Sequence, residues 1–372
     1  MEDYGKLMEK EFEKFEGNGY YPNIVLLGVT GCGKSSLINN VFGVEVAKVC
    51  DIQPETQNFE TFRGKEHGTT VNLIDSKGYE LEDNSESYID RLQRKIYSME
   101  LEGEKINIVW FCLSVSKKRV EEMDLEIIKK VSEIKELKDK IFLVLTKCDE
   151  DDDEGTIAKE YKRILKDNFP QLKAYEVSND EELKLDYDKL IEDSVNSLDD
   201  EDLKAGFIAA QFKNLTLKKE NVEKGLKKYA GMAAAVGAVP IPFSDAALLI
   251  PIQLKMVAEI TEMYGMRNLA TFTKGGVANL VISNLGKNLA ARLIKCIPIA
   301  GSFIGGAINA TVASTITYAI GKATSEICFI NCKKILNGEK IDAFDIFNSE
   351  LFQNLVNTFL KETAKKKGYE EE

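Results

Sequence analysis

The sequence predicts an α/β domain, with a mostly parallel sheet covered by helices on both faces, followed by an all-helical domain. Three observations support this. Short apolar runs alternate with helical periods from Asn23 onwards, which is typical of a parallel sheet with helical crossovers. After about Leu198 the strand-like runs stop, and Ala, Gly and helical periodicity dominate. A chain of 372 residues is also too long for one compact core, so two domains are expected.

The α/β domain is predicted over residues 21–200. Its strand-like runs read NIVLLG, TVNLIDSKG, INIVWFCLS, KIFLVLTKCD and KAYEVSN. Helical periods separate most of these runs, near residues 34–42, 86–100, 121–138, 156–168 and 181–197. The segment ETFRGKEHGTTVNLID has the pattern of a hairpin, so we expect one antiparallel strand pair within the sheet.

The remaining chain divides into three predicted parts. Residues 1–20 hold a short amphipathic helix, residues 205–340 form an Ala/Gly-rich helical domain, and residues 341–372 form a C-terminal helix and charged tail. Cys296–Gly321 has 26 residues without a formal charge, which is long enough to span a bilayer. It also contains Pro298 and Asn309, so buried helices of a soluble domain and some membrane contact both stay open.

Charge is unevenly distributed along the chain. The net charge is -12, yet residues 205–340 carry 16 Lys and Arg against 7 Asp and Glu. This basic helical part suits an anionic membrane or protein partner, although solvated helix faces explain it equally well. Overall acidity argues against nonspecific nucleic-acid binding. The seven cysteines form no CxxC pair, His67 is the only histidine, and the N-terminus lacks an apolar signal region, so we expect a cytoplasmic protein, with peripheral or integral membrane association as the alternative.

The stretch GVTGCGKS, residues 28–35, matches the phosphate-binding pattern GxxxxGK[ST] between a predicted strand and a predicted helix. The backbone N–H groups of such a loop wrap a polyphosphate, and the helix N-terminus adds positive potential. Lys34 is expected to bridge the β- and γ-phosphates, and the Ser35 hydroxyl to bind Mg²⁺. The other loop residues expected at the nucleotide are Gly28, Thr30, Gly31, Cys32, Gly33 and Ser36.

Further motifs follow in the order that a GTP-binding domain requires. Asp75 and Gly78 form an Asp-x-x-Gly motif, in which Asp75 holds Mg²⁺ and the Gly78 N–H meets the γ-phosphate. Thr146, Lys147 and Asp149 form a [NT]KxD motif. The Asp149 carboxylate accepts from two donors that guanine presents together and adenine lacks, which selects GTP over ATP. Ser178 and Asn179 follow the next strand, where a backbone N–H is expected to meet the guanine oxygen.

A threonine that completes the Mg²⁺ shell only with GTP bound is the physical basis of a nucleotide switch. Thr56 in QPETQNF lies 19 residues before Asp75 and is the predicted residue. Thr69, Thr70 or no threonine at all are the alternatives.

These motifs allow a resemblance to be named. Residues 1–200 resemble an Era-type GTPase domain, through GKSSLIN and PETQ, and GVTGCGKSSLIN is also similar to the loop of immunity-related GTPases. The stretch GMAAAVGAVPIPFSDAALLIPIQLKMVAEITEMYG resembles a bacterial helical domain of unknown function that is often fused to such GTPases. The resemblance implies binding of GTP and GDP with Mg²⁺, and a hydrolase whose catalytic residues are Lys34, Thr56 and Gly78.

The sequence departs from the Ras-like pattern at Tyr79, where those relatives carry a glutamine that orients water. We therefore expect slow intrinsic hydrolysis, or a homodimer through the nucleotide face that supplies the missing group. The expected function is a GTP-hydrolysing switch that signals through the helical domain. The alternatives are a nucleotide-gated binding module with negligible hydrolysis and a membrane-acting GTPase that resembles the immunity-related GTPases.

Overall fold

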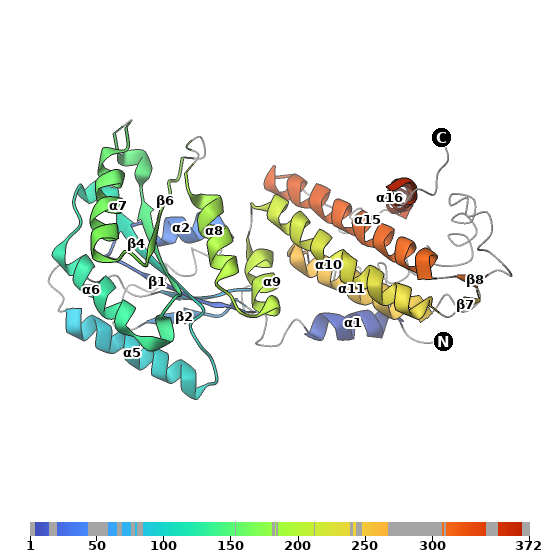
Figure 1. Cartoon of the computed structure of the whole chain (residues 1–372), viewed down its shortest axis with the longest axis horizontal. Coiled ribbons are helices and arrows are strands. Elements are labelled where there is room, and N and C mark those ends of the chain that lie inside the picture. Colours follow the sequence, from blue (N-terminus) through green and yellow to red (C-terminus); the bar gives the residue numbers. More distant parts are fainter. Residues whose placement is uncertain are drawn as a thin grey trace. The chain divides into compact units, whose positions relative to one another are not determined.

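The computed structural model of the chain describes residues 4–14, 21–43, 59–64, 69–75, 79, 85–152, 154–180, 183, 185–211, 213–238, 241–242, 248–266, 307–308, 310–339 and 349–366. The chain forms two compact units. One is Asn18–Lys213, and the other combines Met1–Gly17 with Asn214–Glu372. Figure 1 shows a sheet with surrounding helices in the first unit and long helices in the second.

A six-stranded sheet organises the first unit, with the strand order β2-β3-β1-β4-β5-β6. β2 and β3 pair antiparallel, and every other neighbouring pair in this sheet is parallel. The mostly parallel sheet and its single antiparallel hairpin are therefore confirmed. The strands are β1 (Asn23–Leu27), β2 (Glu60–Phe62), β3 (Asn72–Asp75), β4 (Ile108–Ser114), β5 (Ile141–Thr146) and β6 (Lys173–Glu176).

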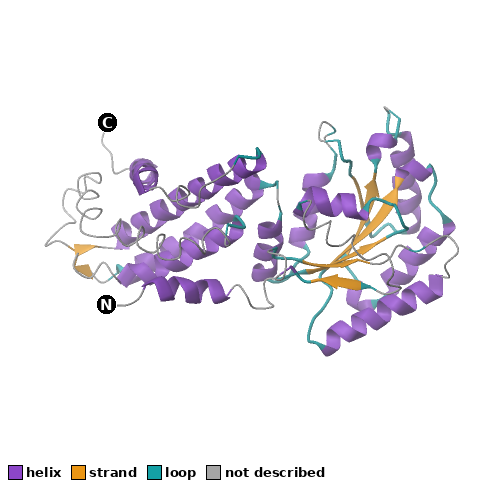
Figure 2. Cartoon of the chain, turned by 180° about the vertical axis from the view of Figure 1, so that it is seen from behind, coloured by secondary structure: helices purple, strands orange, loops and turns teal. Residues whose placement is uncertain are grey.

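Helices cover both faces of this sheet, as Figure 2 shows, and this prediction is also confirmed. The α-helices are α2 (Lys34–Phe42), α5 (Ser85–Leu101), α6 (Glu122–Glu133), α7 (Thr156–Asn168), α8 (Tyr187–Asn196) and α9 (Glu201–Ala210). Short 3₁₀ turns lie at Val115–Lys117, Lys135–Leu137 and Cys148–Glu150.

Two neighbouring aromatic residues of β4, Trp110 and Phe111, point to opposite faces of the sheet. Successive side chains of a strand point to opposite sides of a sheet. Trp110 stacks on Phe42 of α2, meets the edge of Phe207 of α9 and donates through Nε1 to Ser194 of α8 at 3.1 Å. Phe111 packs instead on the ring of Tyr79. Both β4 side chains are fully buried, so the core continues on each side of the sheet.

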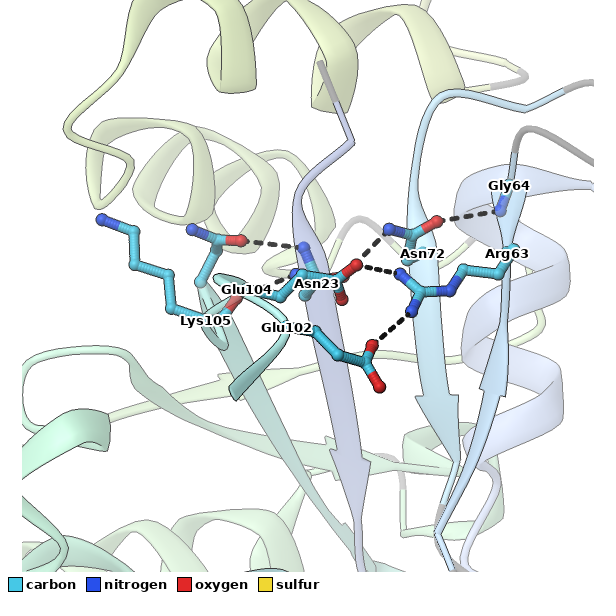
Figure 3. Close-up of polar contacts among 8 residues, drawn as sticks. Asn23, Arg63, Gly64, Asn72, Glu102, Glu104 and Lys105 are labelled. Carbon is cyan, nitrogen blue, oxygen red and sulfur yellow. Dashed lines mark hydrogen bonds and ion pairs between the residues drawn. The ribbon is translucent and has the colours of Figure 1, made fainter. Parts of the chain in front are cut away.

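A polar network ties three strands together where β1 and β3 begin and where the chain enters β4 (Figure 3). The Asn23 side chain accepts from Asn72 Nδ2 and donates to the carbonyl of Lys105, each at 2.9 Å. Asn72 Oδ1 accepts from the Gly64 N–H at 3.0 Å, and Arg63 pairs with Glu104 at 2.5 Å. Buried amides need partners of this kind, because an unpaired one costs about 1–3 kcal/mol. The network fixes the register of the hairpin against β1.

The second unit consists of helices and one short strand pair. Its α-helices are α1 (Tyr4–Lys14), α10 (Leu215–Val236), α11 (Ile250–Met263), α15 (Ala310–Leu336) and α16 (Ser349–Lys366). β7 (Ile241–Pro242) and β8 (Ala307–Ile308) pair antiparallel. α15 packs against α10, α11 and α16. Buried polar contacts between α11 and α15 include Gln253 donating to Thr317 at 3.1 Å, and just after α11 Tyr264 shares a hydrogen bond with Ser325 at 3.0 Å.

The compact units do not divide at the predicted domain boundaries. α1 belongs with the C-terminal helices and packs on α11, whereas the sequence treated residues 1–20 as a separate part. α9 belongs with the sheet, because Phe207 is buried against Phe42 and Trp110. The helical unit accordingly begins at Asn214 rather than near residue 205.

Residues 296–306 and 309 of the long uncharged stretch Cys296–Gly321 lie outside the described residues. Its described part includes the first turns of α15, where Val312, Ala313 and Ile316 are buried. Among the helices of the described ranges, none combines the length and the hydropathy that crossing a bilayer requires.

Gly321 marks the closest approach within the helical unit. A β-carbon there would collide with Leu226 Cδ2 of α10 and would lie 2.9 Å from Met256 Sδ of α11. We therefore expect Gly321→Ala to lower the free energy of unfolding by about 1–3 kcal/mol, because overpacking outweighs the better helix propensity of alanine.

Gly225→Ala is the matched control, because no atom lies within 4 Å of a β-carbon at that position of α10. It should raise the free energy of unfolding by about 0.5–1 kcal/mol through helix propensity alone. Urea denaturation of both variants measures the difference. Equal effects of the two substitutions would contradict this account of the packing.

Candidate nucleotide-binding site

The predicted site residues gather at one edge of the sheet, where β1, β3, β4 and β5 end. The register pairs Leu26 of β1 with Asp75 of β3, and Ser114 of β4 with Thr146 of β5. Because these strands are parallel, the loops that leave their carboxyl ends meet at a common edge. The phosphate loop, residues 28–35, leaves β1 at this edge and enters α2.

Glycines shape the phosphate loop. Gly28, Gly31 and Gly33 have φ values of 137°, 76° and 97°, which other residues rarely adopt. A β-carbon on Gly28 would collide with the Cys112 carbonyl of β4 and lie 2.7 Å from Cys32 Sγ. A β-carbon on Gly33 would lie 3.2 Å from Thr146 Cβ. The loop backbone thus lies directly against β4 and β5, and it can approach them so closely because glycine has no side chain.

Thr146 of β5 holds the phosphate loop through its hydroxyl group. Its hydroxyl donates to the carbonyl of Cys32 and lies 3.3 Å from the carbonyl of Leu113. The side chain is almost fully buried. The sequence predicts Thr146 as a nucleotide-binding residue through its [NT]KxD motif, and in the structure its hydroxyl donates to a backbone carbonyl of the phosphate loop. The spacing of the [NT]KxD motif gave no sign of this contact.

Lys34 and the start of α2 form the cationic part of the site. Lys34 is the first residue of the helix, is 8% exposed, and donates through Nζ to the Gly28 carbonyl at 3.2 Å. The ammonium group therefore folds back over the loop. Ser35 and Ser36 lie in the first helical turn, where the backbone N–H groups and the helix dipole favour an anion.

Asp149, Ser178 and Asn179 come together at the loops that follow β5 and β6. Ser178 Oγ donates to Asp149 Oδ1 at 2.7 Å and accepts from the Asp180 N–H at 2.8 Å. Asn179 Oδ1 accepts from Asn40 of α2 at 2.9 Å. Lys147 adopts a left-handed conformation, with φ of 57°. Ser178 thus orients the carboxylate, a contact that the motif alone does not reveal.

Two of the three predicted Mg²⁺ ligands lie within the described residues. Asp75 ends β3 beside β1, and Ser35 begins α2, so a hydroxyl and a carboxylate approach the loop from neighbouring elements. Oxygen ligands of this kind suit Mg²⁺. Thr56 and Gly78 lie outside the described residues. Thr70 lies just before the other end of β3, and its hydroxyl donates to the Gly206 carbonyl at 2.6 Å, so it does not reach Asp75.

Cys32 of the phosphate loop lies against Cys112 of β4. Cys32 and Cys112 are both buried, and a hydrogen bond joins their thiols. This bond lowers the pKa of Cys32, while it raises the pKa of Cys112, as burial also does. Burial raises the pKa of Cys148, between Lys147 and Asp149, to about 12. All three are free thiols, and Cys32 and Cys112 are buried.

Comparisons with known proteins agree with this geometry. Residues 23–147 match the model of the family described as 50S ribosome-binding GTPase. The first unit therefore contains a P-loop GTPase domain, and the predicted class is confirmed.

Individual relatives are similar only in part. Magnetosome membrane protein 22 of Magnetospirillum gryphiswaldense is 32% identical over 107 residues, which cover 27% of this chain and 53% of that protein. Translocase of chloroplast 33 of Arabidopsis thaliana is 26% identical over 148 residues, covering 39% and 46%. The chain spans about half the length of these curated relatives. A structure of Aquifex aeolicus Era is 17% identical, covers 55% of this chain and 68% of its own, and has a TM-score of 0.34.

Removal of the Thr146 hydroxyl and removal of the Ser178 hydroxyl should change nucleotide affinity in different ways. Thr146→Val should weaken binding of guanosine and inosine diphosphate by the same factor, about tenfold, because the loop carbonyl loses its donor. Ser178→Ala should instead lower the ratio of guanosine to inosine diphosphate affinity. Inosine lacks the exocyclic amine that Asp149 is predicted to bind. Titration calorimetry measures both ratios, and a changed ratio in Thr146→Val would contradict the placement of its hydroxyl.

Proposed function

We propose that this protein binds GTP, hydrolyses it to GDP and phosphate with Mg²⁺, and acts as a nucleotide switch. The observation that carries the proposal is the meeting of a glycine-shaped phosphate loop with the Asp149–Ser178 pair at one sheet edge. The first binds a polyphosphate and the second binds a base with two adjacent donors. Together they select a guanine nucleoside di- or triphosphate.

The chain's own groups supply most of the stabilisation of the transferring phosphoryl group. Loop N–H groups and the start of α2 hold the phosphates, and Lys34 turns from the Gly28 carbonyl to the β- and γ-oxygens. Ser35, Asp75 and the predicted Thr56 would hold Mg²⁺, which would supply positive charge beside the phosphates. In-line attack by water then depends mainly on positioning.

A second candidate is a nucleotide-gated binding module with negligible hydrolysis. The specific observation is the burial of Tyr79, which is 1% exposed and donates its hydroxyl to Asp124. This side chain is not available to orient water. The alternative to this binding module is a homodimer. In it, a second copy docks on the nucleotide face and supplies the group that orients the attacking water. GTP turnover per molecule that rises with protein concentration would support the homodimer.

The helical unit is proposed to pass the nucleotide state to a protein or to an anionic membrane. The basic balance of residues 205–340 supports a peripheral membrane role, as does the partial similarity of this chain to a relative that is named a magnetosome membrane protein. The family description mentions the ribosome, but the matched residues end at 147 and exclude the helical unit. A cytoplasmic protein without nucleic-acid partners remains our expectation.

Lys34→Ala tests hydrolysis. Loss of the ammonium group should lower kcat by about 10²–10³-fold, which is the usual effect of removing one charge-stabilising group. Phosphate release with GTP and Mg²⁺ is the measurement. Lys129→Ala, an exposed lysine on α6, is the control and should keep its turnover. Undiminished phosphate release by Lys34→Ala would sink the assignment.

Asp149→Asn tests which base is read. Xanthine presents one donor and one acceptor where guanine presents two donors, and an amide offers the complementary pair. We expect the variant to prefer xanthosine over guanosine diphosphate by at least about tenfold. Competition binding against a fluorescent nucleotide measures this preference. A variant that still prefers guanosine diphosphate would show that Asp149 does not read the base.

A further inference from the structure

Tyr79 directly follows the Asp-x-x-Gly motif and touches four parts of the GTPase domain. Its carbonyl accepts from the Thr30 N–H of the phosphate loop at 3.3 Å. Its ring meets Tyr88 of α5 edge-on, with centroids 5.3 Å apart, and its centroid lies 6.5 Å from that of Phe111 of β4. Its hydroxyl donates to Asp124 of α6. Backbone and side chain thus hold this residue from opposite sides.

Asp124 is itself held in place. It is 4% exposed, and its second carboxylate oxygen accepts from the Glu121 N–H at 3.3 Å. Glu121 in turn accepts from the backbone of Asp124, so the two residues form a capping box at the start of α6. Burial raises the pKa of Asp124, and the charge of Lys117 opposes this rise. Tyr79 cannot turn outwards without leaving a buried carboxylate oxygen short of a donor, which is costly.

We propose that the Tyr79–Asp124 hydrogen bond holds the chain directly after the Asp-x-x-Gly motif, which makes Tyr79 a positioning residue for the predicted contact between Gly78 and the γ-phosphate. The inference rests on the proposed function. Asp75, which begins the Asp-x-x-Gly motif, is fixed by its register with Leu26 and Glu60. Tyr79 directly follows the motif, so the contacts of Asp75 and Tyr79 hold the chain on both sides of it. The Tyr79 hydroxyl donates to Asp124 and therefore orients no water.

This role differs from that of a residue that contacts the nucleotide. Substitution of a positioning residue should lower the affinity for a nucleotide that carries the γ-phosphate. It should leave the affinity for GDP, which is bound through its base and its other phosphates, unchanged. The two effects separate in a ratio of affinities, because GDP lacks the γ-phosphate. If the tyrosine were purely structural, its substitution would lower the stability of the protein without changing the ratio of the two affinities.

Tyr79→Phe removes the hydroxyl and keeps the ring. In the full-length chain, we expect the ratio of affinities for a non-hydrolysable GTP analogue and for GDP to fall about tenfold, with GDP affinity unchanged within about twofold. At saturating GTP, kcat should fall by a similar factor. Asp124→Asn keeps an oxygen that accepts from Tyr79, and its ratio should stay near that of the wild type.

Tyr175→Phe is the matched control. Tyr175 is also 1% exposed and donates to an aspartate, Asp193, but it lies on β6 in a different part of the same unit. This variant should melt at a lower temperature with an unchanged affinity ratio. The proposal is overturned if Tyr79→Phe keeps the wild-type ratio, or if Tyr175→Phe lowers the ratio as much.

The binding ratio also separates this inference from the proposed hydrolysis. If the wild type binds both nucleotides but releases no phosphate, hydrolysis is wrong, and the ratio in Tyr79→Phe still decides whether Tyr79 is a positioning residue. If the wild type turns over GTP and Tyr79→Phe matches it in both kcat and ratio, only the positioning role fails.

Discussion

The close approach of the phosphate loop to the ends of β4 and β5 is the constraint on which the site depends. Glycine at positions 28 and 33 removes the side chains that would hold the loop away, and the Thr146 hydroxyl then joins the loop to β5 and to the neighbouring β4. A packed interior yields little to displacement, so a loop in such contact keeps its shape before any ligand arrives. Preorganisation of this kind reduces the ordering that nucleotide binding requires.

The two edges of the sheet are built differently. At one edge, side-chain amides and the Arg63 ion pair connect neighbouring strands and leave their register fixed. At the other edge, the contacts run between loops and strand ends, through Thr146, Ser178 and Tyr79. The hairpin of β2 and β3 connects the two edges, because Asn72 begins β3 and Asp75 ends it.

Most of the GTPase fold follows from the sequence because strand and helix periods are strong local signals. The predicted helix at 34–42 and strand runs such as KIFLVLTKCD correspond closely to α2 and β5. Local patterns do not reveal partners distant along the chain. Asp124 reads as a helix-capping residue, and only the fold brings it to Tyr79, 45 positions earlier. Thr146 and Ser178 were predicted as site residues, but their supporting contacts depend on loop conformation. The sequence assigned most of α9 to the helical domain, because its membership in the sheet-containing unit depends on contacts with Phe42 and Trp110 that are distant along the chain.

The membership of α1 in the helical unit has a consequence for how the chain folds. Its partner α11 follows only after the whole GTPase domain, which occupies Asn18–Lys213. Closing so long a loop in an unfolded chain is entropically unfavourable, whereas a folded insert brings its two ends to fixed positions. During synthesis, α1 leaves the ribosome before the GTPase domain and before α11, so its apolar face stays uncovered until α11 follows. Folding of the GTPase domain therefore brings α1 and the chain after Lys213 close enough for α1 and α11 to pack.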